Sequence, residues 1–417
     1  MKEAMVKTEF KQTEVGVIPN DWEVNQLGNL IEKFVNGGTP STQVIEYWNG
    51  NIPWITGADI LNQKVAVIRR YISKEAVKNS STNIIEKGNL LFVSRTGVGK
   101  LAIAPFDIAI SQDFTGIYVK QSELSTDYLF RYFDFIQTEL KSQNQGTSIQ
   151  GITRDTLSSF QIPLPPTKAE QTAIATALND ADALITQLEK LIAKKRNIKQ
   201  GAMQELLRPK EGWMVKKLGE IFKFLNTANN SRVDLVKSGE IEYIHYGDIH
   251  TRWNCFLDCS NNELPFIDKI KVNGVPSLED GDLVVADASE DYEGLGACVE
   301  IKNIGKRKIV AGLHTLLLRS DKNIIADGFK GYLRNYYGVK DTLIRLSTGV
   351  SVYGISKTNL KEVEVSIPPT VEEQTSIAQI LSDMDTEIEA LEKKLEKYKM
   401  IKQGMMQNLL TGKIRLV

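Results

Sequence analysis

The sequence contains few of the residues on which several classes of protein depend. Its 417 residues include three histidines and three cysteines, which is little for acid–base catalysis and does not make a disulfide framework. No run approaches the roughly 18 consecutive apolar residues of a membrane helix, and the charged N-terminal segment lacks the apolar region of a secretory signal. We therefore expect a soluble, cytoplasmic protein in a reducing compartment, without a membrane partner.

Two further shortages concern charge and catalytic motifs. The formal net charge is -1, whereas stand-alone nucleic-acid-binding domains are usually basic, so any contact with DNA must use local patches. The Asn/Asp-Pro-Pro-aromatic motif of an adenine methyltransferase is absent. Gly97-Val-Gly99-Lys100 departs from a Walker A loop, because Ser94 and Leu101 stand where the motif needs Gly and Ser or Thr. We expect neither methylation nor nucleotide binding by this chain alone.

One group of residues contains the side chains that could bind a zinc ion. His245, His250, Cys255 and Cys259 are close in sequence, but their spacings of 5, 5 and 4 positions fit no common zinc finger. The favoured interpretation is that His245 belongs to a strand and that the cysteines pack or face solvent. We predict no metal site and no catalytic residues.

The chain does contain a long internal repeat. Residues 162–207 align without a gap on residues 365–410 at a constant offset of 203 positions, and roughly half of the aligned pairs are identical. Upstream the offset drifts to 189–191, where Ile52–Ile60 (IPWITGADI) matches Ile241–Ile249 (IEYIHYGDI). A period near 200 residues indicates a duplicated domain with its helix and not a solenoid. Loops that differ on two similar frames are where binding specificity usually lies.

The most strongly repeated part has the pattern of a long helix. Thr167-x-x-Glu170 and Thr370-x-x-Glu373 have the form of capping boxes, each preceded by two prolines. Beyond each cap, apolar residues recur at spacings of 4 and 3, which is typical of a coiled-coil seam. The predicted seam residues are Ile174, Leu178, Ile185, Leu188, Ile192, Ile377, Leu381, Ile388, Leu391 and Leu395, with Ala181 and Met384 between them. An ordinary amphipathic helix packed on its own domain remains the alternative.

These patterns predict an α+β fold in which two loop-rich mixed α/β domains alternate with two long helices that pair as an antiparallel coiled coil with pseudo-two-fold symmetry. The expected boundaries are domain 1 at 1–161, helix 1 at 162–208, domain 2 at 209–364 and helix 2 at 365–417. Nearly forty helical residues give a rod of about 50 to 60 Å, long enough to separate two DNA half-sites by a turn or somewhat more. Gly201 and Gly404, in identical Lys-Gln-Gly-x-Met-Gln settings, indicate either a close backbone approach or a local helix break.

Several of these motifs together resemble a known family. GGTPST (Gly37–Thr42) with YWNGNIPWITGADI (Tyr47–Ile60), the Glu-Gln pairs after the prolines, and KQGxMQxLL in both copies are similar to the specificity subunit of Type I restriction-modification enzymes. The resemblance covers nearly the whole chain. It implies two target recognition domains, each reading one half of an interrupted double-stranded DNA target, and helices that set the spacer.

The same resemblance implies partners for this chain. Two modification subunits would methylate adenine from S-adenosylmethionine, and restriction subunits would use ATP and Mg for translocation and cleavage, so no cofactor is expected in this chain. Two alternatives stay open. One is the recognition subunit of a related system whose partner combines methyltransferase and nuclease in one chain, and the other is an enzyme with an unrecognised motif.

The residues that contact DNA should lie in polar loops of the two domains. Direct readout uses Arg, Lys, Asn or Gln at base edges, and phosphates are bound by Lys, Arg, Ser and Thr. The candidates in the first domain are Arg95, Thr96, Lys100, Gln150 and Arg154, and those in the second are Tyr292, Tyr353 and Lys357.

Overall fold

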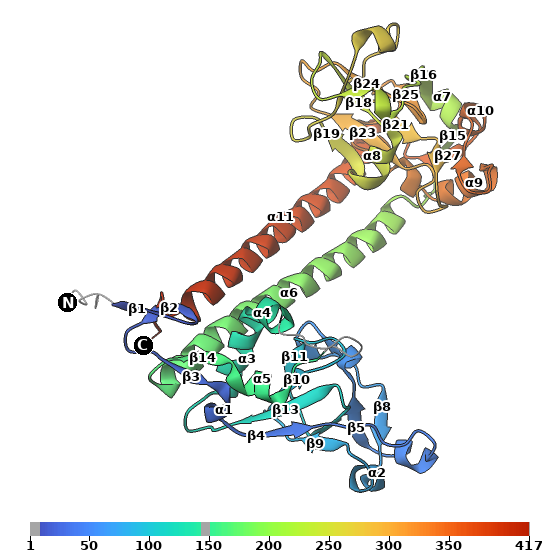
Figure 1. The fold of residues 1–417 in the computed structure, drawn as a ribbon. Helices are drawn as coiled ribbons and strands as arrows, with labels where there is room; N and C mark the ends of the chain where they lie inside the picture. The colour runs from blue at the N-terminus through green and yellow to red at the C-terminus, as the bar shows by residue number, and fades with distance from the viewer. Residues whose placement is uncertain (1–8, 143–150, 417) are drawn as a thin grey trace. The chain divides into compact units, whose positions relative to one another are not determined.

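The computed structural model describes residues 9–142 and 151–416. Contacts divide the chain into two compact units, Met1–Glu189 with Lys393–Val417 and Lys190–Glu392. Each long helix therefore contributes one part to each unit. Both helices have 39 residues, α6 (Lys168–Leu206) and α11 (Val371–Leu409) (Figure 1).

The first unit contains two four-stranded sheets. One is antiparallel, with the strand order β11 (Leu101–Ile103), β10 (Leu90–Val93), β13 (Phe114–Val119) and β4 (Ile31–Asn36). The other has the order β8 (Arg70–Ile72), β5 (Ile52–Ile55), β12 (Ile108–Ile110) and β9 (Asn83–Ile85), with β5 and β12 parallel. Every residue of β10 and of β13 is buried, so these two central strands form the core of the sheet.

Short elements complete the first unit. Its helices are α1 (Leu27–Leu30), α2 (Lys74–Lys78), α3 (Thr126–Phe135), α4 (Gln137–Ser142) and α5 (Arg154–Ser159). Its 3-10 turns are η1 (Ile45–Trp48) and η2 (Gly57–Asp59). Two-stranded pairs are formed by β1 (Phe10–Thr13) with β2 (Gly16–Pro19), β6 (Ile60–Leu61) with β7 (Lys64–Val65), and β3 (Glu23–Gln26) with β14 (Gln161–Leu164).

The second unit repeats this plan. Its five-stranded sheet has the order β16 (Phe222–Leu225), β25 (Thr315–Ser320), β21 (Leu283–Ala286), β23 (Cys298–Lys302) and β19 (Cys255–Asp258). Its four-stranded sheet has the order β17 (Leu235–Val236), β20 (Phe266–Ile267), β18 (Ile241–Ile244) and β24 (Ile309–Ala311), with β18 and β24 parallel. The predicted match between IPWI and IEYI is confirmed, because β5 lies parallel to β12 in the first unit and β18 lies parallel to β24 at the equivalent place in the second.

The remaining elements of the second unit are also short. Its helices are α7 (Leu218–Ile221), α8 (Tyr246–Thr251), α9 (Val339–Leu346) and α10 (Lys357–Lys361), and its 3-10 turns are η3 (Arg232–Asp234), η4 (Lys269–Val272) and η5 (Lys330–Asn335). Two-stranded pairs are formed by β15 (Met214–Lys217) with β27 (Glu364–Ile367) and by β22 (Ala288–Ser289) with β26 (Tyr353–Gly354).

The same backbone hydrogen bonds recur at equivalent positions of the two units. Leu27 N donates to Phe160 O, and Leu218 N donates to Val363 O. These bonds lie beside the β3–β14 and β15–β27 pairs, where the chain enters a domain and leaves it towards a long helix. Each domain is therefore a closed insertion between two paired strands.

Each unit has a core in which parts of both long helices take part. In the first unit Ile174 and Leu178 of α6 join Leu409 and Leu410, at the end of α11, in a cluster with domain residues. In the second unit the equivalent cluster contains Ile377 and Leu381 of α11 with Met203 and Leu207 at the end of α6. Burial of such side chains contributes about 1.5 to 3 kcal/mol each.

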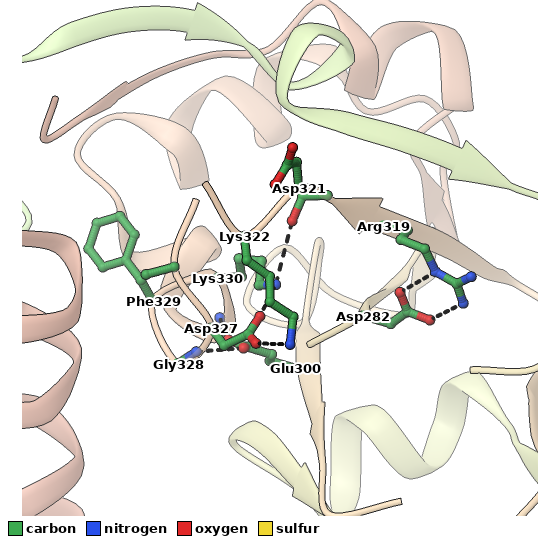
Figure 2. A network of polar contacts seen from close by, with 12 residues as sticks. Asp282, Glu300, Arg319, Asp321, Lys322, Asp327, Gly328, Phe329 and Lys330 are labelled. Atoms are coloured by element: carbon green, nitrogen blue, oxygen red, sulfur yellow. Dashed lines mark hydrogen bonds and ion pairs between the residues drawn. The ribbon is translucent and has the colours of Figure 1, made fainter. Parts of the chain in front are cut away.

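A buried polar network supports the second core (Figure 2). Glu300, which is 0% exposed, accepts hydrogen bonds from the backbone N–H groups of Gly328 and Gly331. The buried Lys330 ammonium contacts the Asp327 carboxylate at 2.6 Å. In the same region Arg319 donates from Nε and Nη2 to the two carboxylate oxygens of Asp282. Because the buried Glu300 and Lys330 side chains are hydrogen-bonded or paired, they fix the turn at η5 against β23.

Candidate nucleic-acid interface

A set of loops at one end of the first antiparallel sheet is joined by backbone hydrogen bonds. Ser94 N and Arg95 N, just after β10, both donate to Asp113 O in the turn before β13. Ile152 N donates to Ser94 O. The loop after β10, the β12–β13 turn and the segment that enters α5 are therefore held together as one surface.

Most of the predicted residues of the first domain lie on this surface. Arg95 and Thr96 are exposed. Arg154, in the first turn of α5, is exposed and its Nε donates to Asn36 Oδ1 at 3.1 Å. Lys100 is half-buried and its Nζ donates to Gly57 O at 3.0 Å, so this ammonium holds the first residue of η2 in place. Gln150 lies outside the described residues.

Sequence reasoning missed a second loop at the same place. A Cβ on Gly37 would overlap the carbonyl groups of Ile110 and Ser111, which explains the glycine pair of the GGTPST motif. Trp54 Nε1 donates to Gly38 O at 3.1 Å. This close approach carries Thr39 to Gln112, with which it forms a hydrogen bond, and both side chains are exposed. The sequence signal that could have identified this loop is the polar residue Thr39 directly after two glycines that the close backbone approach requires.

In the second domain two of the predicted residues contact each other. The rings of Tyr292 and Tyr353 are stacked with centroids 4.1 Å apart. Tyr353 lies in β26, opposite Ser289 of β22, and Tyr292 is 46% exposed. Lys357 is half-buried in the first turn of α10. Aromatic rings on a solvent-facing surface can contact bases or sugars.

The three histidines lie around Tyr246. Sequence reasoning weighed His245 and His250 as zinc ligands and rejected that site, and it gave His314 no role. The Tyr246 ring has its centroid 4.6 Å from His245, 6.1 Å from His250 and 5.3 Å from His314. His245 Nδ1 accepts a hydrogen bond from Gly247 N at 3.1 Å and caps α8. Burial, together with the charge of Arg232, lowers the pKa of His245. This residue is therefore a neutral structural cap, and the expectation that it belongs to the strand is wrong by one position, since β18 ends at Ile244.

His314 occupies the position that Asp113 has in the first domain. Asp287 N donates to His314 O at 3.1 Å, as Ser94 N donates to Asp113 O at 2.7 Å. The His314 Nδ1 and Asp287 Oδ1 atoms are 3.3 Å apart. Burial raises the pKa of Asp287, and the neighbouring His314 opposes that rise. The two domains thus use one frame to present different polar side chains.

The cysteines behave as packing residues. Cys255, Cys259 and Cys298 are free and buried, and Cys255 and Cys259 belong to different apolar clusters. Burial raises the pKa of Cys255 to about 12. Within residues 9–142 and 151–416, no group of three or more His, Cys, Asp or Glu side chains is arranged to hold a metal ion.

The starts of the long helices are fixed differently from the predicted capping boxes. Thr167 Oγ1 and Thr370 Oγ1 accept hydrogen bonds from Glu170 N and Glu373 N, each at 3.2 Å. The glutamate side chains do not complete the box: Glu170 accepts from Arg415, and Glu373 accepts from Trp213 Nε1. These donors, which are distant in sequence, occupy the glutamate carboxylates in place of the N-cap backbone N–H. They thereby anchor other chain segments to the helix.

The glutamine of each Glu-Gln pair connects its helix to the adjoining domain. Gln171 accepts from Ser125 N and donates to Glu123 O. Gln374 likewise accepts from Ala326 N and donates to Ile324 O. Both glutamines are 1% exposed, so the repeated motif positions a domain on the first turn of its helix.

Charged residues connect α6 and α11 within each unit. In the first unit Lys402 pairs with Asp182 at 2.7 Å and Lys399 with Glu189 at 3.8 Å. In the second unit the repeat-related residues make the same pairs, Lys199 with Asp385 and Arg196 with Glu392. Lys195 also pairs with Glu387 at 2.6 Å. The repeat therefore preserves two ion pairs between the helices.

Most predicted seam residues are buried. Those below 10% exposure are Ile174, Leu178, Leu188, Ile192, Ile377, Leu381, Ile388 and Leu395, whereas Ile185 and Leu391 are half-buried. Both helices continue through Gly201 and Gly404, so the alternative of a local helix break is wrong. No other segment of the described chain makes the expected close approach either, because apart from the glycine's chain neighbours and the backbone of its own helix no described atom lies within 4 Å of a Cβ placed at either glycine. None of the described helices is long and apolar enough to cross a membrane.

Known proteins share both the sequence and the fold. The family model described as the Type I restriction modification DNA specificity domain matches residues 19–200 and 210–399. The MjaIX specificity subunit of a Type I restriction enzyme from Methanocaldococcus jannaschii is 29% identical over 380 residues, covering 87% of this chain and 82% of the relative. The MjaVIII specificity subunit of the same organism is 27% identical and covers 98% and 96%. A crystal structure of the S subunit of a Type I restriction-modification system from M. genitalium has a TM-score of 0.57 at 17% identity, covering 96% of this chain and 98% of that one.

Proposed function

Because the chain belongs to the Type I restriction modification DNA specificity domain family, it is a DNA target recognition subunit, and we propose that each of its two domains reads one half of an interrupted target. The observation that carries this proposal is the repeated frame with different loops. Asp113 and His314 occupy the same hydrogen-bonded position in the two domains, so the frames are shared while the reading groups differ. Two different half-sites follow from two different sets of loop residues.

On this proposal, base contacts come from the exposed loop residues. In the first domain these are Arg95, Thr96 and Arg154, with Thr39 and Gln112 beside them, whereas Lys100 supports the loop from within. Gln150 stays a candidate from the sequence alone. In the second domain the surface consists of Tyr292 and Tyr353 with the segment around His314, and Lys357 follows in α10 as a candidate phosphate contact.

We further propose that α6 and α11 pair along their length as an antiparallel coiled coil and set the spacer between the half-sites. The support is the repeat of two ion pairs at equivalent positions of the two units and the burial of the seam residues. At 1.5 Å per residue, a helix of 39 residues is about 58 Å long.

The partners of this chain are proposed to supply all catalysis. We assign no cofactor to this chain and expect two modification subunits to bring S-adenosylmethionine and restriction subunits to bring ATP and Mg. The repeat supplies two equivalent surfaces for the modification subunits. Ile198 and Ile401, which are related by the repeat, are 47% and 43% exposed, and each lies three residues before a glycine with open space around it. Apolar side chains exposed beside small residues allow close helix packing by a partner.

The structure suggests how to test modular reading without disturbing the helices. Residues 27–160 can be exchanged for those of another domain of this kind, so that β3, β14 and the whole of α6 remain native. The matched exchange in the second domain is 218–363, which leaves β15 and β27 intact. With a modification subunit present, each exchange should change one half of the methylated target and leave the other. A single exchange that altered both half-sites would contradict independent reading.

A further inference from the structure

All three histidines of the chain lie in the second domain, around one tyrosine. His245, His250 and His314 surround Tyr246 with ring centroids 4.6 to 6.1 Å away. Two of them have structural partners: His245 caps α8, and His250 Nε2 lies 3.0 Å from Ala288 O. His314 differs from both because its side chain is 50% exposed.

The backbone around His314 is held in an unusual conformation. His314 has φ 55, a left-handed conformation that few residues other than glycine adopt. The two residues before it are fixed: Leu313 N donates to Tyr243 Oη at 2.8 Å and Gly312 N donates to Ile244 O at 2.9 Å. Strained residues held by such surroundings cluster at binding sites. The imidazole is therefore presented from a rigid frame.

The chemistry beside His314 fits a base edge better than a phosphate. Asp287 Oδ1 lies 3.3 Å from His314 Nδ1, so a donor and an acceptor stand side by side. In the major groove, guanine presents the acceptors N7 and O6, while cytosine and adenine present amino donors. A carboxylate would repel a phosphate, which makes this pair a poor contact for the DNA backbone.

We propose that His314 and Asp287 read a base edge in the half-site recognised by the second domain. The inference deepens the proposed function and depends on it. The first domain has an equivalent surface at Asp113 and Arg95. This surface occupies the same place in the frame as His314 and Asp287 but contains no histidine. Reading in the two domains should therefore respond differently to pH.

The direction of this response follows from the groups around His314. Asp287 faces it directly, and across Tyr246 are His245 and the ion pair of Arg232 with Asp248. Histidine changes its charge between about pH 5 and 8, and a protonated imidazole donates a stronger, charge-assisted hydrogen bond. Discrimination at the contacted base pair should increase as the pH falls through this range.

The test uses the full chain in complex with a modification subunit and measures binding to duplexes in which each base pair of each half-site is changed in turn, from pH 5.5 to 8.0. Discrimination is the ratio of the dissociation constants for the altered and the matched duplex at one pH, so that effects of pH on the partner cancel. His314→Asn is the main variant, because asparagine tolerates the left-handed conformation. Asp287→Asn tests the acceptor, and His245→Asn is the control that retains an N-cap.

We expect His314→Asn to reduce discrimination at one or two base pairs of the second half-site by roughly tenfold or more and to abolish its pH dependence. The first half-site should be unaffected, and His245→Asn should leave both half-sites unchanged. Unaltered discrimination and pH dependence in His314→Asn and Asp287→Asn would overturn the inference. Absence of any sequence preference in the wild-type complex would instead overturn the proposed function, and the inference with it.

Discussion

Asp182 and Lys402 form an ion pair of 2.7 Å in the first unit, and Asp385 and Lys199, which stand 203 positions from them in the repeat, form the equivalent pair in the second. The environment of the two pairs differs. Asp182 also pairs with Arg131, which is 5% exposed and reaches Asn179, whereas Asp385 is close to Tyr332. The repeat thus keeps the contact between the helices while each domain packs against it in its own way.

The Asp182 cluster should contribute to stability in a pH-dependent way. Burial acts to raise the pKa of Asp182, but hydrogen bonds and charge from Lys402 and Arg131 outweigh it, so the pKa lies below its usual value. A lowered pKa stabilises the fold above the pKa of the unfolded state, near 3.9, and this contribution is lost as the pH falls through the folded-state pKa. Asp182→Asn should lower the free energy of unfolding at pH 7 by about 1 to 3 kcal/mol, because it deprives the buried Arg131 of its charge partner.

Urea denaturation between pH 3 and 7 measures this effect. Lys402→Ala is the comparison variant: it removes the more exposed of the two cationic partners of Asp182 and leaves the pair with Arg131 intact, so it should cost less than Asp182→Asn. An Asp182→Asn variant as stable as the wild type at pH 7 would show that the cluster does not stabilise the first unit.

Arg415 should anchor the C-terminal segment to the first domain. Its guanidinium contacts the carboxylates of Asp21 and of Glu170, which is 1% exposed. The hydrogen bond from Arg415 lowers the pKa of Asp21. Arg415→Ala leaves Glu170 buried without this partner and should destabilise the first unit by about 2 to 4 kcal/mol.

Hydrogen exchange of residues near the start of α6 measures the loss. Arg415→Lys should recover only part of the stability, because lysine cannot bind two carboxylates through a planar fork. Equal protection in Arg415→Ala and the wild type would contradict the anchoring role.

The two exposed isoleucines should each bind one modification subunit. Ile198→Asp and Ile401→Asp introduce a charge into an apolar contact at equivalent positions of the repeat, so each single variant should bind one modification subunit where the wild type binds two. The double variant should bind none. Native mass spectrometry gives the stoichiometry directly, and two bound subunits in the double variant would place the docking surface elsewhere.

The length of the helices should determine the spacer. One heptad inserted between Glu189 and Lys195 of α6, with a second between Glu392 and Lys399 of α11, leaves the ion pairs on either side intact. Each insertion adds about 10 Å, so we expect a spacer roughly three base pairs longer with unchanged half-sites. Sequencing of methylated DNA provides the measurement. An unchanged spacer from a folded variant would exclude the helices as the ruler.

The sequence predicted the parts of the fold that follow from local chemistry. Helix starts after Pro-Pro-Thr and the equivalence of β5 with β18 were readable from proline, threonine and apolar spacing. The partners of Glu170 and Glu373 were not, because Arg415 and Trp213 are 245 and 160 residues away in sequence. His314 was overlooked for a similar reason: only the pairing of β21 with β25 brings it beside Asp287.

The measurement that tests the central claim most directly is methylome sequencing of cells that express this chain with a cognate modification subunit, compared with cells that express the modification subunit alone. We predict one new methyladenine motif, made of two different half-sites separated by a spacer of fixed length, that depends on this chain. A continuous or symmetric motif, or the same methylation without this chain, would contradict the account.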